Sequence, residues 1–138
     1  MTEEIEKIYD QALERYQAGE EPEVLIPAFK DICQQAPDLP YAWSSLAWLY
    51  LLNDQPKLAL KAAKRGVKIN RGAPQSRVNL VLAMLTLGEK GVRDHVEKAQ
   101  YMISQRDELR QEVEANIEDG LKRKPDWQEL IKVKKWLT

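Results

Sequence analysis

The sequence repeats itself at a fixed offset of 34 residues. Aromatic, aliphatic and proline positions meet residues of a similar kind one period later: Tyr9 with Trp43, Tyr16 with Tyr50, Pro22 with Pro56, Ile26 with Leu60, Pro40 with Pro74, Leu46 with Leu80 and Tyr50 with Met84. A series of matches at one offset indicates a chain built from successive copies of one structural unit. This constrains the fold strongly, because each copy must pack against its neighbours.

Each copy has the pattern of two antiparallel helices, and residues 40–73 show this most clearly. Trp43, Leu46 and Tyr50 recur at the spacing of one helix face. Pro56 then favours a helix boundary, because proline disfavours a helical residue before it but suits the first turn of a helix. A second helix with small inward-facing residues is predicted to follow. Neither helix can bury its apolar face alone, so successive pairs are expected to stack.

These units resemble the tetratricopeptide repeat, whose signature has Trp, Leu-Gly and Tyr on the first helix, followed by Ala, an aromatic residue, Ala and Pro. In residues 40–73 the signature positions hold Trp43, Leu46, Ala47, Tyr50, Ala59, Ala63 and Gly66. In residues 6–39 they hold Tyr9, Ala12, Leu13, Tyr16, Leu25, Phe29, Ile32 and Pro37. A third unit, residues 74–106, carries Pro74, Leu80, Val81 and Met84. The resemblance implies an all-α, single-domain solenoid of about three helix pairs wound as a right-handed superhelix.

Residues 107–138 are expected to form a helical cap over the last repeat. Apolar residues follow at four-residue steps from Leu109, and Asp126 is expected to cap a final helix that carries Trp127. The end units of a repeat array must shield the last apolar face from water. The pattern leaves open whether residues 93–122 form one helix or two.

Composition limits the classes of partner and location. The formal net charge is −1, so no overall field attracts nucleic acid or an anionic membrane. Residues 1–23 nevertheless carry a net −6 and residues 120–138 a net +4. The longest apolar run, residues 46–52, is too short for a membrane span, and the N-terminus lacks the pattern of a secretory signal. A single cysteine excludes an internal disulfide, and a cytoplasmic location is expected.

Little in the sequence suggests chemistry. His95 is the only histidine and Cys33 the only cysteine, so one chain holds no multi-histidine metal site. The sequence has no Gly-rich phosphate loop and no Gly-x-Ser-x-Gly turn. The carboxylates lie on helical faces rich in partner charges, as is usual for a solvated surface. We therefore expect no enzyme activity, no cofactor and no metal.

The resemblance implies a concave groove lined by the first helix of each pair, in which the family holds a peptide or a partner helix. Helical geometry assigns to that groove the positions about a quarter turn from the packing stripe. The candidate binding residues are Asp10, Glu14, Tyr41, Ser44, Ser45, Trp48, Leu52, Val78, Asn79 and Leu82. The groove should be acidic at one end and apolar and aromatic in its middle, with Trp48 as the main anchor for a partner.

This pattern favours a protein partner of particular chemistry. Family members that bind the acidic tails of chaperones use Lys, Asn and Arg at these positions, whereas Asp10 and Glu14 would repel such a tail. A helical or extended segment with apolar anchors and basic residues fits better. The hypothesis is therefore a non-catalytic adaptor, scaffold or assembly factor.

Two alternatives remain. The chain's own C-terminal helix, or that of a twin in a homo-oligomer, could cover Trp48 and Leu52, which would make the protein a self-associating module. The basic side chains of the C-terminal helix could instead contact nucleic acid, and these are Lys122, Arg123, Lys124, Lys132, Lys134 and Lys135. A solvated face is the more usual role of such lysines, which also favour the C-terminal end of a helix.

Overall fold

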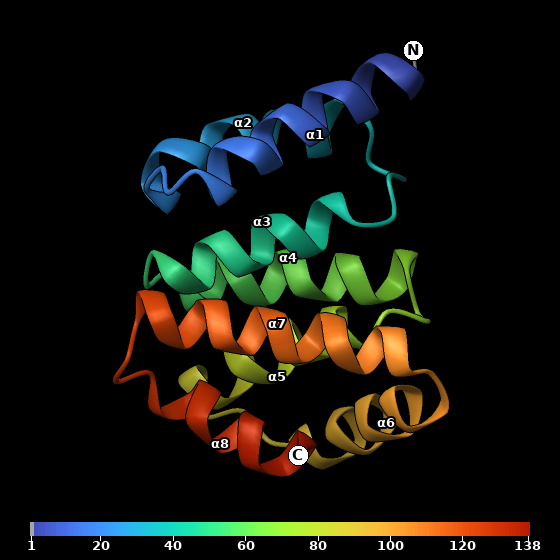
Figure 1. Ribbon diagram of the computed structural model, residues 1–138, viewed down its shortest axis with the longest axis vertical. Helices are drawn as coiled ribbons and strands as arrows, with labels where there is room; N and C mark the ends of the chain where they lie inside the picture. The colour runs from blue at the N-terminus through green and yellow to red at the C-terminus, as the bar shows by residue number, and fades with distance from the viewer. Residues whose placement is uncertain (1) are drawn as a thin grey trace.

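The computed structural model describes residues 2–138, which form eight α-helices and no strand (Figure 1). The helices are α1 (Thr2–Gln17), α2 (Pro22–Gln35), α3 (Ala42–Leu52), α4 (Pro56–Ile69), α5 (Pro74–Leu87), α6 (Val92–Gln105), α7 (Asp107–Arg123) and α8 (Gln128–Leu137). The all-helical fold class expected from the repeat is confirmed. None of these helices is both long and apolar enough to cross a membrane.

Proline sets the start of three helices. Pro22, Pro56 and Pro74 stand in the first turns of α2, α4 and α5. This position suits proline, because its fixed φ matches the helix and the missing N–H would have no partner within the helix. The helix boundaries that the repeat predicts therefore follow from local chemistry.

The first six helices pack in chain order. Each of α1 to α5 packs on the helix that follows it, and α3 also contacts α5 (Figure 1). The helices of the middle pair approach closely at Gly66, where an added Cβ would lie 3.4 Å from the backbone nitrogen of Ser44. The core between the helices is aliphatic and aromatic, and its largest fully buried side chains include Leu25, Phe29 and Leu49.

Residues 93–122 form parts of two helices. Arg106 takes an extended conformation, with φ −144° and ψ 117°, and separates α6 from α7. The final helix also differs from expectation, because Trp127, and not Asp126, stands at its N-cap. The expected cap was wrong because the bend before α8 is closed by the backbone N–H of Trp127, which donates to the carbonyl of Lys124 at 3.1 Å.

The last two helices form what we term the C-terminal arm, α7 and α8 together. They pack on each other and on α5 and α6. In Figure 1, α7 lies across the middle of the molecule, with α1 and α2 above it and α6 and α8 below it. The arm therefore does more than cap the end of the array, because it also reaches back toward the first two helix pairs.

Candidate binding cleft

The ten groove residues predicted from the sequence fall into two groups. Asp10 and Glu14 are exposed on α1, Tyr41 is 39% exposed, and Ser44 and Ser45 are half-buried. The other five are buried, namely Trp48, Leu52, Val78, Asn79 and Leu82. The expected open groove is therefore closed over Leu52, Val78 and Leu82, whereas Trp48 and Asn79, although buried, still line the part that remains open.

The C-terminal arm explains part of this burial. Helix α5, which carries Val78 and Leu82, is surrounded by α3, α4, α6, α7 and α8. Trp48 is 9% exposed because the arm lies against it, with its ring centroid 5.4 Å from that of Trp127. This is the covered state that the sequence left open as an alternative, with the chain's own C-terminal helices as the cover.

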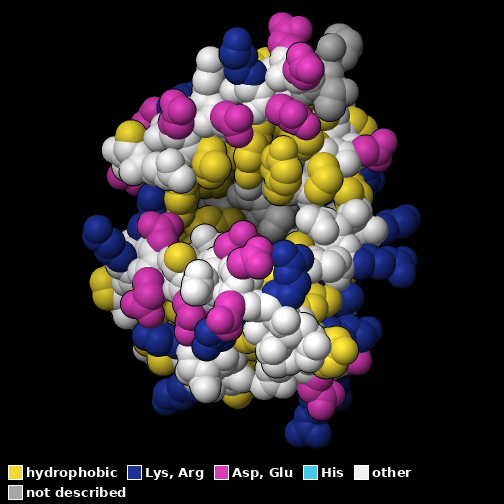
Figure 2. Space-filling model, turned by 45° about the vertical axis from the view of Figure 1, so that its right-hand side comes forward, with side chains coloured by type: hydrophobic (Ala, Val, Ile, Leu, Met, Phe, Trp, Pro, Cys, Tyr) yellow, Lys and Arg dark blue, Asp and Glu magenta, His cyan; other side chains and the backbone are white. Residues whose placement is uncertain are grey.

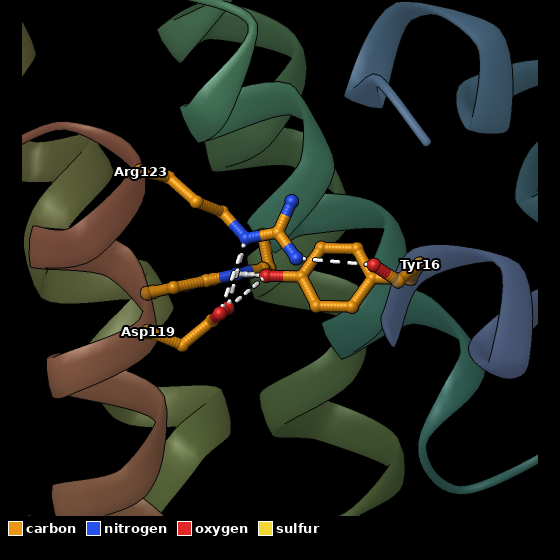
Figure 3. Close-up of polar contacts among 4 residues, drawn as sticks. Tyr16, Asp119 and Arg123 are labelled. Carbon is orange, nitrogen blue, oxygen red and sulfur yellow. Dashed lines mark hydrogen bonds and ion pairs between the residues drawn. The ribbon is translucent and has the colours of Figure 1, made fainter. Parts of the chain in front are cut away.

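A cluster around Tyr16 joins the arm to the first two helix pairs (Figure 3). The Tyr16 hydroxyl donates to the Asp119 carboxylate and accepts a hydrogen bond of 2.8 Å from Trp48 Nε1. Arg123 Nε donates to the same carboxylate at 3.2 Å, and its Nη2 donates to the Tyr16 carbonyl at 3.0 Å. We call these four residues the Tyr16 cluster.

The Tyr16 phenol is held in its protonated form. Burial and the hydrogen bond to the Asp119 carboxylate together raise the pKa of Tyr16 well above its ordinary value. The Arg123 guanidinium also lies over the Tyr16 ring, 4.0 Å from its centroid, which is a favourable cation–π distance. The cluster is thus a set of mutually satisfied contacts at the place where α1, α3 and α7 meet.

A glycine lets α7 lie this close to α3 and α8. A Cβ added at Gly120 would lie 2.6 Å from Leu130 Cδ2 and 2.9 Å from Trp48 Cη2. Carbon atoms in proteins do not approach that closely without a shift of the neighbouring groups. Gly120 therefore sets the distance between the arm and the aromatic side chain that it covers.

Polar side chains connect the arm to α5 and α3. Asn116 Nδ2 donates to Gln75 Oε1 at 3.0 Å, and Gln75 Nε2 donates to Asn79 Oδ1 at 2.8 Å. Asn79 Nδ2 in turn donates to the carbonyl and the hydroxyl of Ser44, at 2.9 and 3.0 Å. We call this series the amide ladder. It satisfies both polar atoms of the buried Asn79 side chain, so this residue has a structural explanation.

One part of the predicted groove remains open between α1 and α7, and we call it the α1–α7 cleft. Its volume is about 110 Å³. The lining residues come from five helices and are Leu13, Tyr16, Phe29, Ser44, Ser45, Trp48, Leu49, Gln75, Asn79 and Asn116. Figure 2 shows the hollow with hydrophobic side chains inside it and acidic side chains above and below. The cleft thus offers apolar contact and polar side chains together.

The residues most able to do chemistry lie apart from this cleft. Burial raises the pKa of the Cys33 thiol to about 12, which keeps it protonated. The His95 Nδ1 lies 3.0 Å from Arg77 Nη1, and burial and the guanidinium lower the pKa of His95. Within residues 2–138, no group of three or more His, Cys, Asp or Glu side chains is placed to hold a metal ion.

Sequence reasoning missed the residues with which the arm contacts the first helices. Asp119 and Arg123, which contact α1, belong to a helix whose apolar spacing predicted only a cap, as does Asn116, which contacts α5. One signal was available, since Gly120 stands inside an apolar-periodic segment, where a glycine often marks a close approach of two backbones or side chains. No local pattern identified Asp119 as the partner of Tyr16, because 103 positions separate them.

Comparison with known proteins identifies solved structures of similar fold. No protein-family model matches the sequence, and no curated protein matches it significantly. The type III secretion translocator chaperone SycD of Yersinia enterocolitica, solved as an alternative dimer, matches with 22% identity and a TM-score of 0.68 over 95% of this chain and 93% of that chain. Another SycD structure matches with 19% identity and a TM-score of 0.69 over 88% and 90%. At these levels of identity, the similarity shows only that the chains share a tetratricopeptide-like fold.

Proposed function

We propose that this chain is a non-catalytic protein-binding module, of the chaperone or assembly-factor type, that holds a segment of a partner protein in the α1–α7 cleft. The observation that carries this proposal is the cleft itself, which combines apolar walls with hydroxyl and amide groups and has acidic side chains at its edges (Figure 2). Grooves that bind peptides combine apolar contact for affinity with a few polar groups that fix orientation.

The open residues define the chemistry of the partner. Tyr41 packs on Tyr9, with ring centroids 4.7 Å apart, and presents an aromatic surface near the hydrogen-bonded Tyr9 and Ser45 hydroxyls. Asp10 and Glu14 lie exposed on α1. A segment with an apolar anchor and basic residues is therefore favoured, and an acidic tail is disfavoured because these carboxylates would repel it. The shared fold with the SycD chaperone supports a role of this kind.

Two observations support a role without catalysis. The thiol of Cys33 is buried with a pKa of about 12, so it does not form the thiolate that a nucleophile needs. The lone histidine is engaged by Arg77, away from the cleft. Covalent catalysis requires a nucleophile with a base beside it, and Cys33 and His95 do not form such a pair.

The test is a selection of peptides displayed on phage against the full-length chain, followed by affinity measurements with the peptides selected. Tyr41→Ala should weaken binding by about tenfold or more, which is the loss expected for an aromatic anchor. The double variant Asp10→Lys, Glu14→Lys should weaken peptides with basic residues most. The matched controls are Tyr101→Ala and Glu97→Lys, both exposed on α6. If the controls reduce affinity as much as the cleft variants, the partner site lies elsewhere.

The covered state of Trp48 favours a second candidate. The arm already places Trp127 where a partner's aromatic anchor would lie, so a twin's arm could replace it and join two copies. Self-association of this kind predicts that the mass of the protein falls on dilution. A mass that stays at that of one chain across all concentrations would remove this candidate.

The C-terminal lysines give less support to nucleic-acid binding. Lys124 Nζ lies 2.6 Å from Asp54 Oδ1, and Lys134 Nζ lies 2.7 Å from Glu118 Oε1, so these two charges are already paired. Absence of binding to RNA and DNA at low salt, where such contacts are strongest, would exclude this role.

A further inference from the structure

A second groove lies between α2 and α4, on the side of α3 away from the cleft. Its volume is about 600 Å³, compared with about 110 Å³ for the α1–α7 cleft. The apolar residues that line it are Cys33, Trp43, Leu46, Tyr50, Leu58 and Ala62. Leu58 is 44% exposed at its edge, so the groove is open to solvent. We call it the α2–α4 groove.

Every charged side chain that lines this groove is basic. These side chains are Lys30, Lys61, Lys64, Arg65 and Lys68, and Gln34 is the remaining polar residue. None of the four lysines forms an ion pair within the described part of the chain. The groove therefore has an apolar floor, and unpaired positive charges surround it.

The charge pattern of α4 is unusual for a chain with a net charge of −1. Residues 55–88 contain no Asp or Glu and seven Lys or Arg, five of them in α4. Lys57 lies in the first turn of this helix, where the helix dipole disfavours a cation, whereas Lys68 lies in the last turn, where a cation is favoured. Lys64 and Lys68 stand one turn apart, and like charges at that spacing are destabilising. The like charges along α4 therefore repel one another, and only Lys68 gains from the helix dipole.

We propose that the α2–α4 groove is a second docking surface, and that it takes an acidic amphipathic segment of a partner protein. Glutamate or aspartate side chains of that segment would pair with Lys30, Lys61, Lys64 and Lys68. Its apolar face would cover Leu58 and the exposed part of Trp43. Charge complementarity of this kind increases the association rate and selects against partners of the wrong sign.

The shape of the groove favours a protein segment over nucleic acid. Single-stranded nucleic acid binds by stacking its bases on open aromatic faces. Here the Arg65 guanidinium lies over the Trp43 ring, 4.8 Å from its centroid, and Tyr50 is almost fully buried. An anionic membrane would require a protruding apolar face, whereas this surface is hollow with only Leu58 among its aliphatic residues exposed.

The test uses the full-length chain and a fluorescently labelled synthetic peptide with leucine at every third or fourth position and glutamate between. We expect this peptide to bind, and matched peptides with lysine in place of glutamate, or serine in place of leucine, to fail. The double variant Lys64→Glu, Lys68→Glu should weaken binding by about tenfold or more, the equivalent of about 1.4 kcal/mol. Leu58→Ser should weaken it without a change of charge.

The matched control is Lys132→Glu, Lys135→Glu, which makes the same charge change at exposed positions of α8 and should leave the affinity unchanged. Tyr41→Ala should also leave it unchanged, which separates this surface from the α1–α7 cleft. Equal losses in the two charge variants would overturn the proposal. The proposal would also be overturned if single-stranded RNA or anionic vesicles bound through Lys64 and Lys68 and the peptide did not bind. Self-association that Lys64→Glu, Lys68→Glu abolishes would assign the groove to a second copy instead.

Discussion

At the scale of single residues, Tyr16 joins the arm to both α1 and α3. Its hydroxyl lies between the indole of Trp48 and the carboxylate of Asp119, and its backbone carbonyl accepts from Arg123. One side chain of α1 therefore contacts both the floor of the predicted groove and the helix that covers it. Because the groups are partly buried, loss of one partner leaves the others unsatisfied.

Tyr16→Phe removes the hydroxyl and keeps the ring. We expect the free energy of unfolding to fall by about 1–3 kcal/mol, because Trp48 Nε1 and the Asp119 carboxylate each lose a partner. Chemical denaturation measures this difference. Tyr101→Phe is the matched control, since Tyr101 is 67% exposed, and it should change stability by less than about 0.5 kcal/mol. Equal stability of the two variants would show that the hydroxyl contributes nothing to arm docking.

His95 makes stability depend on pH. Burial, and then the Arg77 guanidinium, lower its pKa below the ordinary value of 6.5, so the unfolded chain binds a proton more readily than the folded one. The contribution of the neutral imidazole is therefore present above pH 6.5 and lost as the pH falls through the lowered value. We expect the free energy of unfolding to decrease over that interval and His95→Gln to reduce the decrease, measured by denaturation at several pH values.

Two lowered carboxyl pKa values do not obscure this test. Hydrogen bonds from Lys98 and Arg15 lower the pKa of Asp94 and Glu20 from ordinary values of 3.8 and 4.5. Their contributions are fully present above pH 4.5, so they take no part in a loss of stability that begins at pH 6.5. An unchanged pH dependence in His95→Gln would contradict the role assigned to His95.

At the scale of elements, α7 determines which part of the predicted groove is open to a partner. It lies over Trp48 at Gly120, beside Trp127 at the N-cap of α8, and it joins α5 and α3 through the amide ladder. The part of the groove over α3 and α5 is thereby closed, and the part beside α1 stays open. The same helix is both the cover of one region and a wall of the α1–α7 cleft.

Gly120→Ala tests the close approach of α7. Alanine favours a helix interior over glycine by about 1 kcal/mol, whereas overpacking costs about 1–3 kcal/mol. The Leu130 methyl can move, but the Trp48 ring is rigid, so the clash should win and stability should fall by about 1 kcal/mol. Amide hydrogen exchange in α7 should also become faster. Gly72→Ala is the matched control, since an added Cβ there meets nothing within 4 Å. A more stable Gly120→Ala protein would contradict the close packing.

At the scale of the whole molecule, two surfaces of different character lie on different sides of α3. The α1–α7 cleft is the smaller one, is lined by apolar and uncharged polar side chains, and has acidic residues at its edge. The α2–α4 groove is larger, and all the charged residues that line it are basic. The two proposals therefore predict partners of opposite charge. Because no charged residue is shared between them, variants in one surface should leave the other intact.

The fold was predictable because its determinants are local. The 34-residue repeat is found by comparing the sequence with itself, and the prolines that begin α2, α4 and α5 each act on their own helix turn. Trp48 and Asn79 line the cleft, but their accessibility depends on α7, which lies far away in sequence. The absence of Asp and Glu from residues 55–88 can be read from the sequence, but the net charge of −1 for the whole chain does not reveal it.

The proposed partner site between α1 and α7 is tested most directly by site-specific photo-crosslinking in the full-length chain. A benzoylphenylalanine replaces Tyr41, which packs on Tyr9 beside the Ser45 hydroxyl of the cleft, or, in a matched protein, Tyr101 on α6. Each protein is irradiated with a peptide selected by phage display. We expect a cross-link to the peptide from position 41 and none from position 101. A cross-link from position 101, with none from position 41, would contradict a partner site between α1 and α7.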